Sequence, residues 1–89
     1  MTGVLAKRGD AFSETTIDDE VVLLNLADGT FFSLTGTAAR IWGLIDGTRD
    51  RAALLADLAA AYGVPTAAIA PDVEAFLAQL GEAGFLERG

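Results

Sequence analysis

The sequence has no cysteine and no histidine among its 89 residues, and only six basic side chains stand against thirteen acidic ones. Without cysteine there is no disulfide framework, thiol nucleophile, iron–sulfur cluster or thiolate-bound zinc. Without histidine there is no imidazole base, no Ser-His-Asp triad and none of the usual transition-metal sites. These absences exclude several classes of catalytic and metal chemistry, and we expect no metal or other cofactor.

The shortage of basic residues gives a formal net charge of −7, which repels phosphate backbones and anionic membranes. No apolar run approaches the ~20 residues that span a bilayer. The first ten residues, MTGVLAKRGD, lack the apolar middle and small-residue cleavage site of a signal peptide. These features predict a soluble, cytoplasmic module that binds neither nucleic acid nor membrane.

Apolar residues are plentiful, and they include 17 alanines, 12 leucines and five phenylalanines. This content argues against disorder. The length allows one domain over residues 1–89, and a domain of this size buries only about 60% of the surface that its unfolded chain exposes.

The first half of the chain predicts three strands. Phe12–Ile17 favours a pleated backbone and is followed by an acidic, solvated turn at Asp18-Asp19-Glu20. Two apolar runs, Val21–Leu26 and Thr30–Leu34, flank Asp28-Gly29, which is a strong signal for a two-residue hairpin turn. With that turn, Leu26 faces Phe31, Asn25 faces Phe32 and Leu23 faces Leu34.

The second half has helical periodicity. One helix is expected from a Thr35 N-cap to Gly47, with an apolar stripe at positions 38, 41, 42 and 45. A second runs from Thr48 or Asp50 to Tyr62 and buries Leu54, Leu55, Leu58 and Tyr62. A loose turn at 66–69 precedes a third helix at 71–82, because Pro71 suits a first turn. Its apolar stripe is Val73, Phe76, Leu77 and Leu80, and Phe85-Leu86 is expected to fold back onto the core.

These elements give an α+β fold that is winged-helix-turn-helix-like, with a three-stranded antiparallel sheet followed by three helices (β-β-β-α-α-α). The segment LADGTFFSLTGTAARIWGLIDGTRDRAALLADLAAAYGV, followed by DVEAFLAQLGEAGFL, resembles the PqqD-like family of RiPP recognition elements. The resemblance covers about residues 20–86. Its most specific parts are Phe32-x-Leu34, Ala39-x-Ile41-Trp42 with Asp46-Gly47, and Asp72-Val73-x-x-Phe76-Leu77-x-x-Leu80. Thr35 departs from the asparagine that the family commonly has there, and Pro71 precedes the Asp-Val pair.

The resemblance implies a non-catalytic adaptor that binds the leader of a ribosomally made precursor peptide. The leader adds as a strand beside the third strand, in a cleft shared with the third helix. The resemblance also implies a partner enzyme, such as a radical-SAM enzyme or a leader peptidase, in a lasso-peptide or PQQ-type pathway.

The physical chemistry of the third strand agrees with this interpretation. An apolar edge strand without Lys or Pro is an aggregation liability unless a segment covers it, and an added peptide strand would cover it. The predicted peptide-binding residues are Phe31, Phe32, Ser33, Leu34, Asp72, Ala75, Phe76, Gln79 and Leu80. Core packing is the alternative role for the apolar members, and favourable interaction with the helix dipole is the alternative for Asp72.

The same residues argue against three other functions. A DNA-binding winged helix fits the topology, but the third helix contains Asp72, Glu74 and Glu82 and no basic residue. An enzyme would lack a base beside its hydroxyl nucleophiles, and an acyl-carrier protein would lack its Asp-Ser-Leu attachment site. A purely structural subunit, dimeric or domain-swapped through its edge strands, is the remaining alternative.

Overall fold

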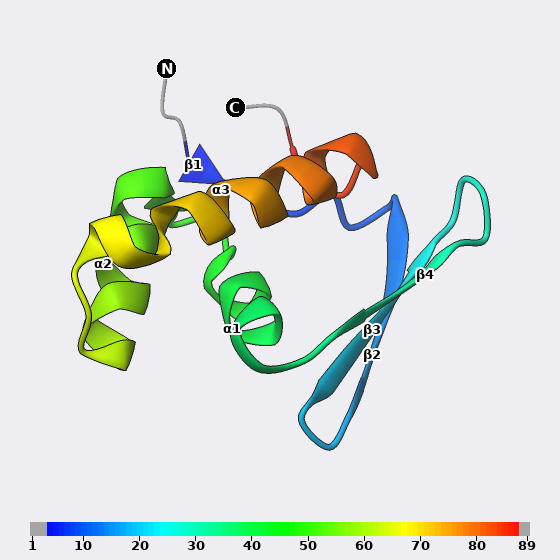
Figure 1. Cartoon of the computed structure of the whole chain (residues 1–89). Coiled ribbons are helices and arrows are strands. Elements are labelled where there is room, and N and C mark those ends of the chain that lie inside the picture. The colour runs from blue at the N-terminus through cyan, green and yellow to red at the C-terminus, as the bar shows by residue number, and fades with distance from the viewer. Residues whose placement is uncertain (1–3, 88–89) are drawn as a thin grey trace.

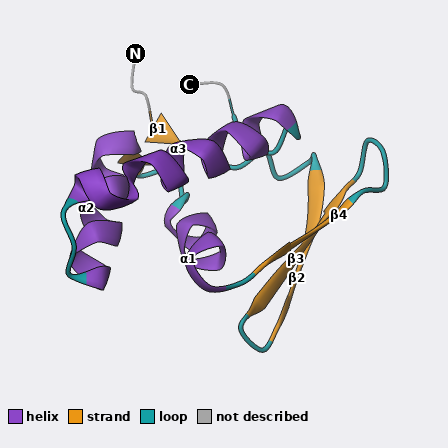
Figure 2. Cartoon of the chain, viewed as in Figure 1, coloured by secondary structure: helices purple, strands orange, loops and turns teal. Residues whose placement is uncertain are grey.

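The computed structural model describes residues 4–87 and contains a helical layer packed against one side of a small sheet (Figures 1 and 2). In chain order the elements are β1 (Val4–Leu5), β2 (Phe12–Ile17), β3 (Glu20–Asn25), β4 (Phe31–Leu34), α1 (Gly36–Leu44), β5 (Arg49–Asp50), α2 (Arg51–Tyr62) and α3 (Thr66–Glu82). The three-stranded sheet and the three helices confirm the predicted α+β fold. None of the helices in this part of the chain is long and apolar enough to cross a membrane.

The main sheet is antiparallel, in the order β2-β3-β4. Burial alternates along β3, where Val21, Leu23 and Asn25 are buried and the residues between them are half-buried. The buried set faces the helices, because successive side chains of a strand point to opposite faces. The sheet therefore has an inner face in the core and an outer face that the helices leave uncovered (Figure 2).

The β3–β4 connection differs from the predicted two-residue turn. Leu24 lies opposite Phe31, Leu23 opposite Phe32 and Val21 opposite Leu34, so the predicted register was wrong by two residues. The loop is longer because Asn25 and Thr30 close it, with the Asn25 N–H donating to the Thr30 carbonyl at 2.7 Å. A shift of two residues returns every side chain to the same face, so the predicted faces are retained.

In this loop, side-chain oxygens accept the hydrogen bonds that backbone carbonyls would accept in a tight turn. The Ala27 N–H donates to Asn25 Oδ1, and the Thr30 N–H and hydroxyl both donate to Asp28 Oδ1 at 2.9 and 2.6 Å. Gly29 has φ +77° and occupies the left-handed conformation that the loop requires.

The helix ends differ from the predictions in two places. α1 ends at Leu44, three residues before Gly47, and the Thr35 side chain makes no capping bond. α3 begins at Thr66, five residues before the predicted start, and contains Pro71. A proline near the N-terminal end removes only one intrahelical hydrogen bond, and its ring here is exposed, so the alanine-rich segment continues as helix.

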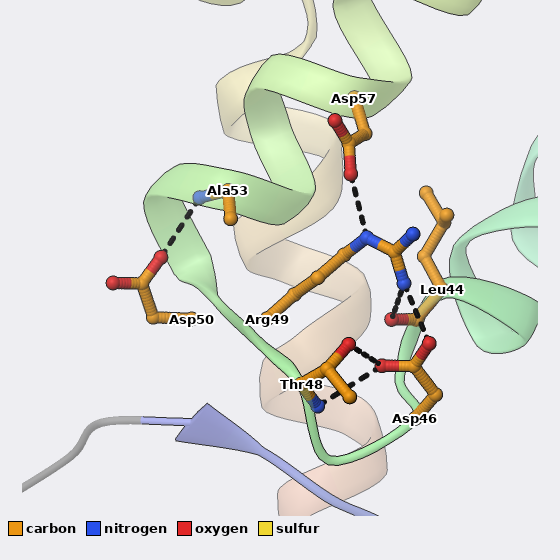
Figure 3. A network of polar contacts seen from close by, with 7 residues as sticks. All are labelled: Leu44, Asp46, Thr48, Arg49, Asp50, Ala53 and Asp57. Atoms are coloured by element: carbon orange, nitrogen blue, oxygen red, sulfur yellow. Dashed lines mark hydrogen bonds and ion pairs between the residues drawn. The ribbon is translucent and has the colours of Figure 1, made fainter.

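The connection between α1 and α2 is a polar network (Figure 3). Asp46 Oδ1 accepts from the N–H and the hydroxyl of Thr48, and the Arg49 guanidinium bridges Asp46 and Asp57. Asp50 caps α2 by accepting from the Ala53 N–H at 2.8 Å, which confirms one of the two predicted starts. The short β1–β5 pair, which the sequence analysis missed, joins the N-terminal segment to this connection.

An aromatic cluster fills the centre of the core. Phe12 contacts Trp42 and Phe85 edge to face, with ring centroids 5.1 and 5.3 Å apart, and Phe32 contacts Phe85 at 5.2 Å. Phe85 is fully buried, as predicted for the segment after α3. Tyr62 was predicted to be buried but is 41% exposed, because its ring lies beside Arg40 at the surface.

Candidate functional site

The outer edge of β4 is open. β4 is the last strand of the sheet, and no strand in residues 4–87 pairs with its second side. Asn25 and Thr30 form a hydrogen-bonded pair. Along an antiparallel ladder, hydrogen-bonded pairs alternate with pairs whose backbone groups point away from the partner strand. Phe32 and Leu34 therefore direct their backbone groups toward β3, whereas Phe31 and Ser33 direct theirs outward. Two N–H groups and two carbonyls are available along this edge.

The side chains of β4 alternate between the two faces of the sheet. Phe32 is half-buried against Phe85, and Leu34 is 5% exposed in the core. Phe31 is 70% exposed on the outer face, and the exposed Ser33 donates from its hydroxyl to Glu20. The predicted set from this strand is thus divided, with Phe32 and Leu34 on the helix side and Phe31 and Ser33 on the other.

α3 provides a second wall. With a period of 3.6 residues, one flank of this helix comprises Asp72, Ala75, Gln79 and Glu82, all of which are exposed. Phe76 and Ala83 lie beside that flank and are half-buried, and Leu80 is 2% exposed in the core. Leu80 is therefore part of the core, and the other predicted residues of α3 lie on or beside the exposed flank.

A pocket of about 440 Å³ joins the two walls at the hairpin end of the sheet. Of the nine predicted residues, it brings together Phe32 from β4 and Gln79 from α3. Its complete lining is Asn25, Asp28, Thr30, Phe32, Gln79, Glu82 and Ala83. Asp72, Ala75 and Phe76 lie further toward the N-terminal end of α3 and do not line this pocket.

Sequence reasoning missed several residues of this lining. Glu82 and Ala83 follow Gln79 by three and four residues, so continuing the helical stripe by one turn would have found them. Asn25 and Thr30 enter the lining because they close the longer hairpin loop, which the predicted tight turn excluded.

Asn25 is also the structural link between the walls. It is 6% exposed, and its Nδ2 donates to the carbonyl oxygen of Ala83 at 3.3 Å. Its Oδ1 accepts from the Ala27 N–H at 2.9 Å. This side chain therefore holds the hairpin loop against the C-terminal end of α3 and fixes one end of the space between β4 and α3.

The mouth of the pocket is acidic, with Asp28 on the loop and Glu82 on the helix. The hydroxyl and backbone N–H of Thr30 donate to Asp28 and hold the pKa of its carboxyl below the ordinary value. Asp28 is therefore ionised at neutral pH. In residues 4–87 no three His, Cys, Asp or Glu side chains gather as a metal site.

A larger pocket of about 740 Å³ lies on another flank of α3, where Ala78 and Gly81 face Arg8 and Arg51. Val4 contributes to its lining, but it belongs to β1, which is already paired with β5. We place the candidate site at β4, which is a longer strand at the edge of the three-stranded sheet.

The fold and the site define a class of protein: a small α+β domain with winged-helix-like element order and an open strand edge beside its last helix. The family model described as coenzyme PQQ synthesis protein D (PqqD) matches residues 20–86. The chain belongs to the PqqD family, and the resemblance seen in its sequence motifs is confirmed.

A solved structure agrees with this assignment. The chain is similar to the structure titled "TbiB1 in Complex with the TbiA(beta) Leader Peptide", with 34% sequence identity and a TM-score of 0.79. The match covers 91% of this chain and 94% of that one. A comparison with curated proteins found no significant match.

Proposed function

We propose that this protein is an adaptor that binds the leader segment of a ribosomally made precursor peptide and presents it to a modifying enzyme or a leader peptidase. The observation that carries the proposal is the open edge of β4 beside the pocket that Phe32 and Gln79 share. The solved complex of TbiB1 with a leader peptide, on the same fold, supports it.

Binding proceeds by strand addition. An extended leader segment pairs with the outward N–H and carbonyl groups of Phe31 and Ser33, which gives up to four main-chain hydrogen bonds. Main-chain bonds of this kind provide affinity without regard to sequence, and pockets for alternate side chains provide selectivity. Every second leader side chain then points toward α3, into the space that Phe32 and Gln79 line.

The remaining predicted residues have distinct parts in this arrangement. Ala75 and Asp72 extend the wall of α3 beyond the pocket, and the small Ala75 side chain leaves room for a leader side chain. Phe76 adds a half-buried apolar surface, and Leu34 and Leu80 support the two walls from the core. The acidic mouth at Asp28 and Glu82 favours a basic or polar leader residue at that end.

The affinity expected from this mode is moderate. A flexible peptide loses conformational freedom when it is ordered as a strand, and this loss offsets part of the gain from hydrogen bonds and buried side chains. Moderate affinity suits an adaptor, because the leader has to be released after the enzyme has acted.

DNA binding is not supported by the surface that it would need. α3 presents Asp72, Glu74 and Glu82 and contains no basic residue. A helix with this charge is repelled from the major groove.

Calorimetric titration tests the proposal. The probe is a synthetic leader of the cognate precursor peptide, and the control is a scrambled peptide of the same composition. We expect saturable one-to-one binding of the leader and none of the scrambled peptide. Equal binding of the two peptides, or of neither, would contradict the proposed function.

A further inference from the structure

The outer face of the sheet is a second surface, and several of its residues are apolar. We define the outer face by the apolar residues that point away from the helices: Ile17, Val22, Leu24 and Phe31. Ile17 and Phe31 are 58% and 70% exposed, and Val22 and Leu24 are half-buried between them. Leu24 lies directly opposite Phe31, so their side chains form one continuous apolar area across β3 and β4.

No helix in residues 4–87 covers this face, since α1, α2 and α3 all lie on the other side of the sheet (Figure 2). Contiguous exposed apolar areas on small monomeric proteins mark interaction surfaces more often than isolated exposed residues do. We therefore expect a binding partner to cover the outer face.

The charges around it identify the chemistry of that occupant. Three carboxylates, Asp18, Asp19 and Glu20, stand together at the β2–β3 turn, next to Ile17, and strands β2, β3 and β4 contain no lysine or arginine. A partner surface complementary to the outer face has an apolar centre and a rim of lysine and arginine. A second copy of this chain would bring two acidic faces together, and anionic lipid or nucleic acid would be repelled.

The outer face also continues into the proposed leader-binding edge. An added leader strand widens the sheet by one strand, and its outward side chains then stand beside Phe31 and Ser33. A protein seated on the outer face would contact the domain and the bound leader at once. By reciprocity, such a protein binds the leader-loaded domain more tightly than the empty one.

We infer that the outer face is the docking surface for the enzyme that acts on the leader, and that this enzyme presents a basic-rimmed apolar patch to it. The inference rests on the proposed function, because it takes the bound leader to be part of the docking surface.

Two substitutions on β2 and β3 test the inference. Ile17→Thr and Leu24→Thr each remove apolar area from the outer face while keeping a residue that favours strands. Neither residue belongs to the proposed peptide site. The matched control is Tyr62→Thr, which removes an exposed aromatic side chain from α2. The probe is the purified modifying enzyme or leader peptidase that acts on the same precursor peptide, titrated with the leader-saturated domain.

We expect Ile17→Thr and Leu24→Thr to weaken enzyme binding by about tenfold, with leader affinity and the Tyr62→Thr control unchanged. Asp19→Lys should weaken enzyme binding and reduce its dependence on salt. If the leader binds but both outer-face variants bind the enzyme as tightly as wild type, the inference is wrong and the proposed function stands. If the leader does not bind the wild-type domain, the proposed function is wrong as well. A wild-type dimer that Ile17→Thr converts to a monomer would assign the face to a second copy and overturn the inference.

Discussion

Asn25 Nδ2 donates a hydrogen bond to the carbonyl oxygen of Ala83, across a separation of 58 residues in the chain. The bond joins the end of β3 to the C-terminal end of α3, at the point where the pocket between β4 and α3 closes. Because Asn25 also accepts from the Ala27 N–H, one buried side chain sets both the shape of the loop and its distance from the helix.

Asn25→Ala should therefore destabilise the fold and loosen the site together. Loss of the side chain leaves two backbone groups without their partner, which costs about 1–3 kcal/mol of unfolding free energy. Urea denaturation measures this loss, and calorimetric titration with the leader measures the change in affinity. Asn25→Asp keeps the acceptor for Ala27 and loses the donor to Ala83, so it separates the two bonds. Stability of both variants within about 0.5 kcal/mol of wild type would show that the link is unimportant.

Ser33→Pro should weaken leader binding while the fold survives. The Ser33 N–H points to the open edge and makes no ladder bond with β3, so proline removes a donor that only an added strand would use. We expect leader affinity to fall by about tenfold or more. Ser33→Ala is the control, since it removes only the hydroxyl bond to Glu20 and should bind the leader normally. Equal affinity for Ser33→Pro and Ser33→Ala would argue against pairing at this edge.

Ala75→Trp should block the space between β4 and α3. Ala75 is exposed on the flank of α3 that includes Gln79, so an indole there occupies room needed by a leader side chain without disturbing the core. Ala78→Trp is the matched control, because Ala78 lines the other pocket of this helix. Leader titrations of the two variants, with circular dichroism to verify folding, should show a loss for Ala75→Trp alone. Comparable affinities for both would place the leader elsewhere.

Acid should weaken the connection between α1 and α2 through Asp46. Donation from the Thr48 hydroxyl and N–H, and then the Arg49 guanidinium, lower the pKa of this carboxyl from its ordinary 3.8. A carboxyl whose pKa is lower in the folded state stabilises that state above the ordinary value, and the contribution is lost as pH falls through the folded pKa.

The urea midpoint of Asp46→Asn should accordingly lie below that of wild type at pH 7, and the difference should disappear in strong acid. Asp28→Asn is the comparison, since Asp28 makes the same bonds to Thr30 but has no arginine partner in the described residues. Its effect at pH 7 should be smaller. A difference for Asp46→Asn that is constant from pH 7 to strong acid would contradict this assignment.

The sequence Asp-Gly-Thr occurs twice and shows what a local pattern can predict. At Asp28 and at Asp46 the aspartate accepts from the N–H and the hydroxyl of the threonine two residues later, and the glycine between them has a positive φ. The first copy predicted a turn correctly, but the predicted loop length of two residues was wrong. The Asp-Gly motif indicates where the chain turns, and it does not indicate which pair of residues forms the last hydrogen bond before the loop. That pair includes Asn25, whose side chain is held by a distant segment.

The edge position of β4 was predictable because this strand leads directly into a helix. The face of each of its side chains was predictable because successive side chains of a strand alternate between the two faces of a sheet. The contribution of α3 was only partly predictable. Helical spacing gives a flank that includes Ala75 and Gln79, but how far this flank runs beside β4 depends on the Asn25–Ala83 link. α3 begins earlier than predicted because the helical preference of the alanines before Pro71 outweighs the preference of proline for the first turn of a helix.

Amide hydrogen exchange, followed residue by residue by NMR with and without the leader, tests strand addition at β4 most directly. The amides of Phe32 and Leu34 already donate within the sheet, so their exchange should change little when the leader binds. The outward amides of Phe31 and Ser33 should slow by about tenfold or more, because each gains a carbonyl partner on the added strand. Saturable leader binding that leaves the exchange of Phe31 and Ser33 unchanged would contradict the account.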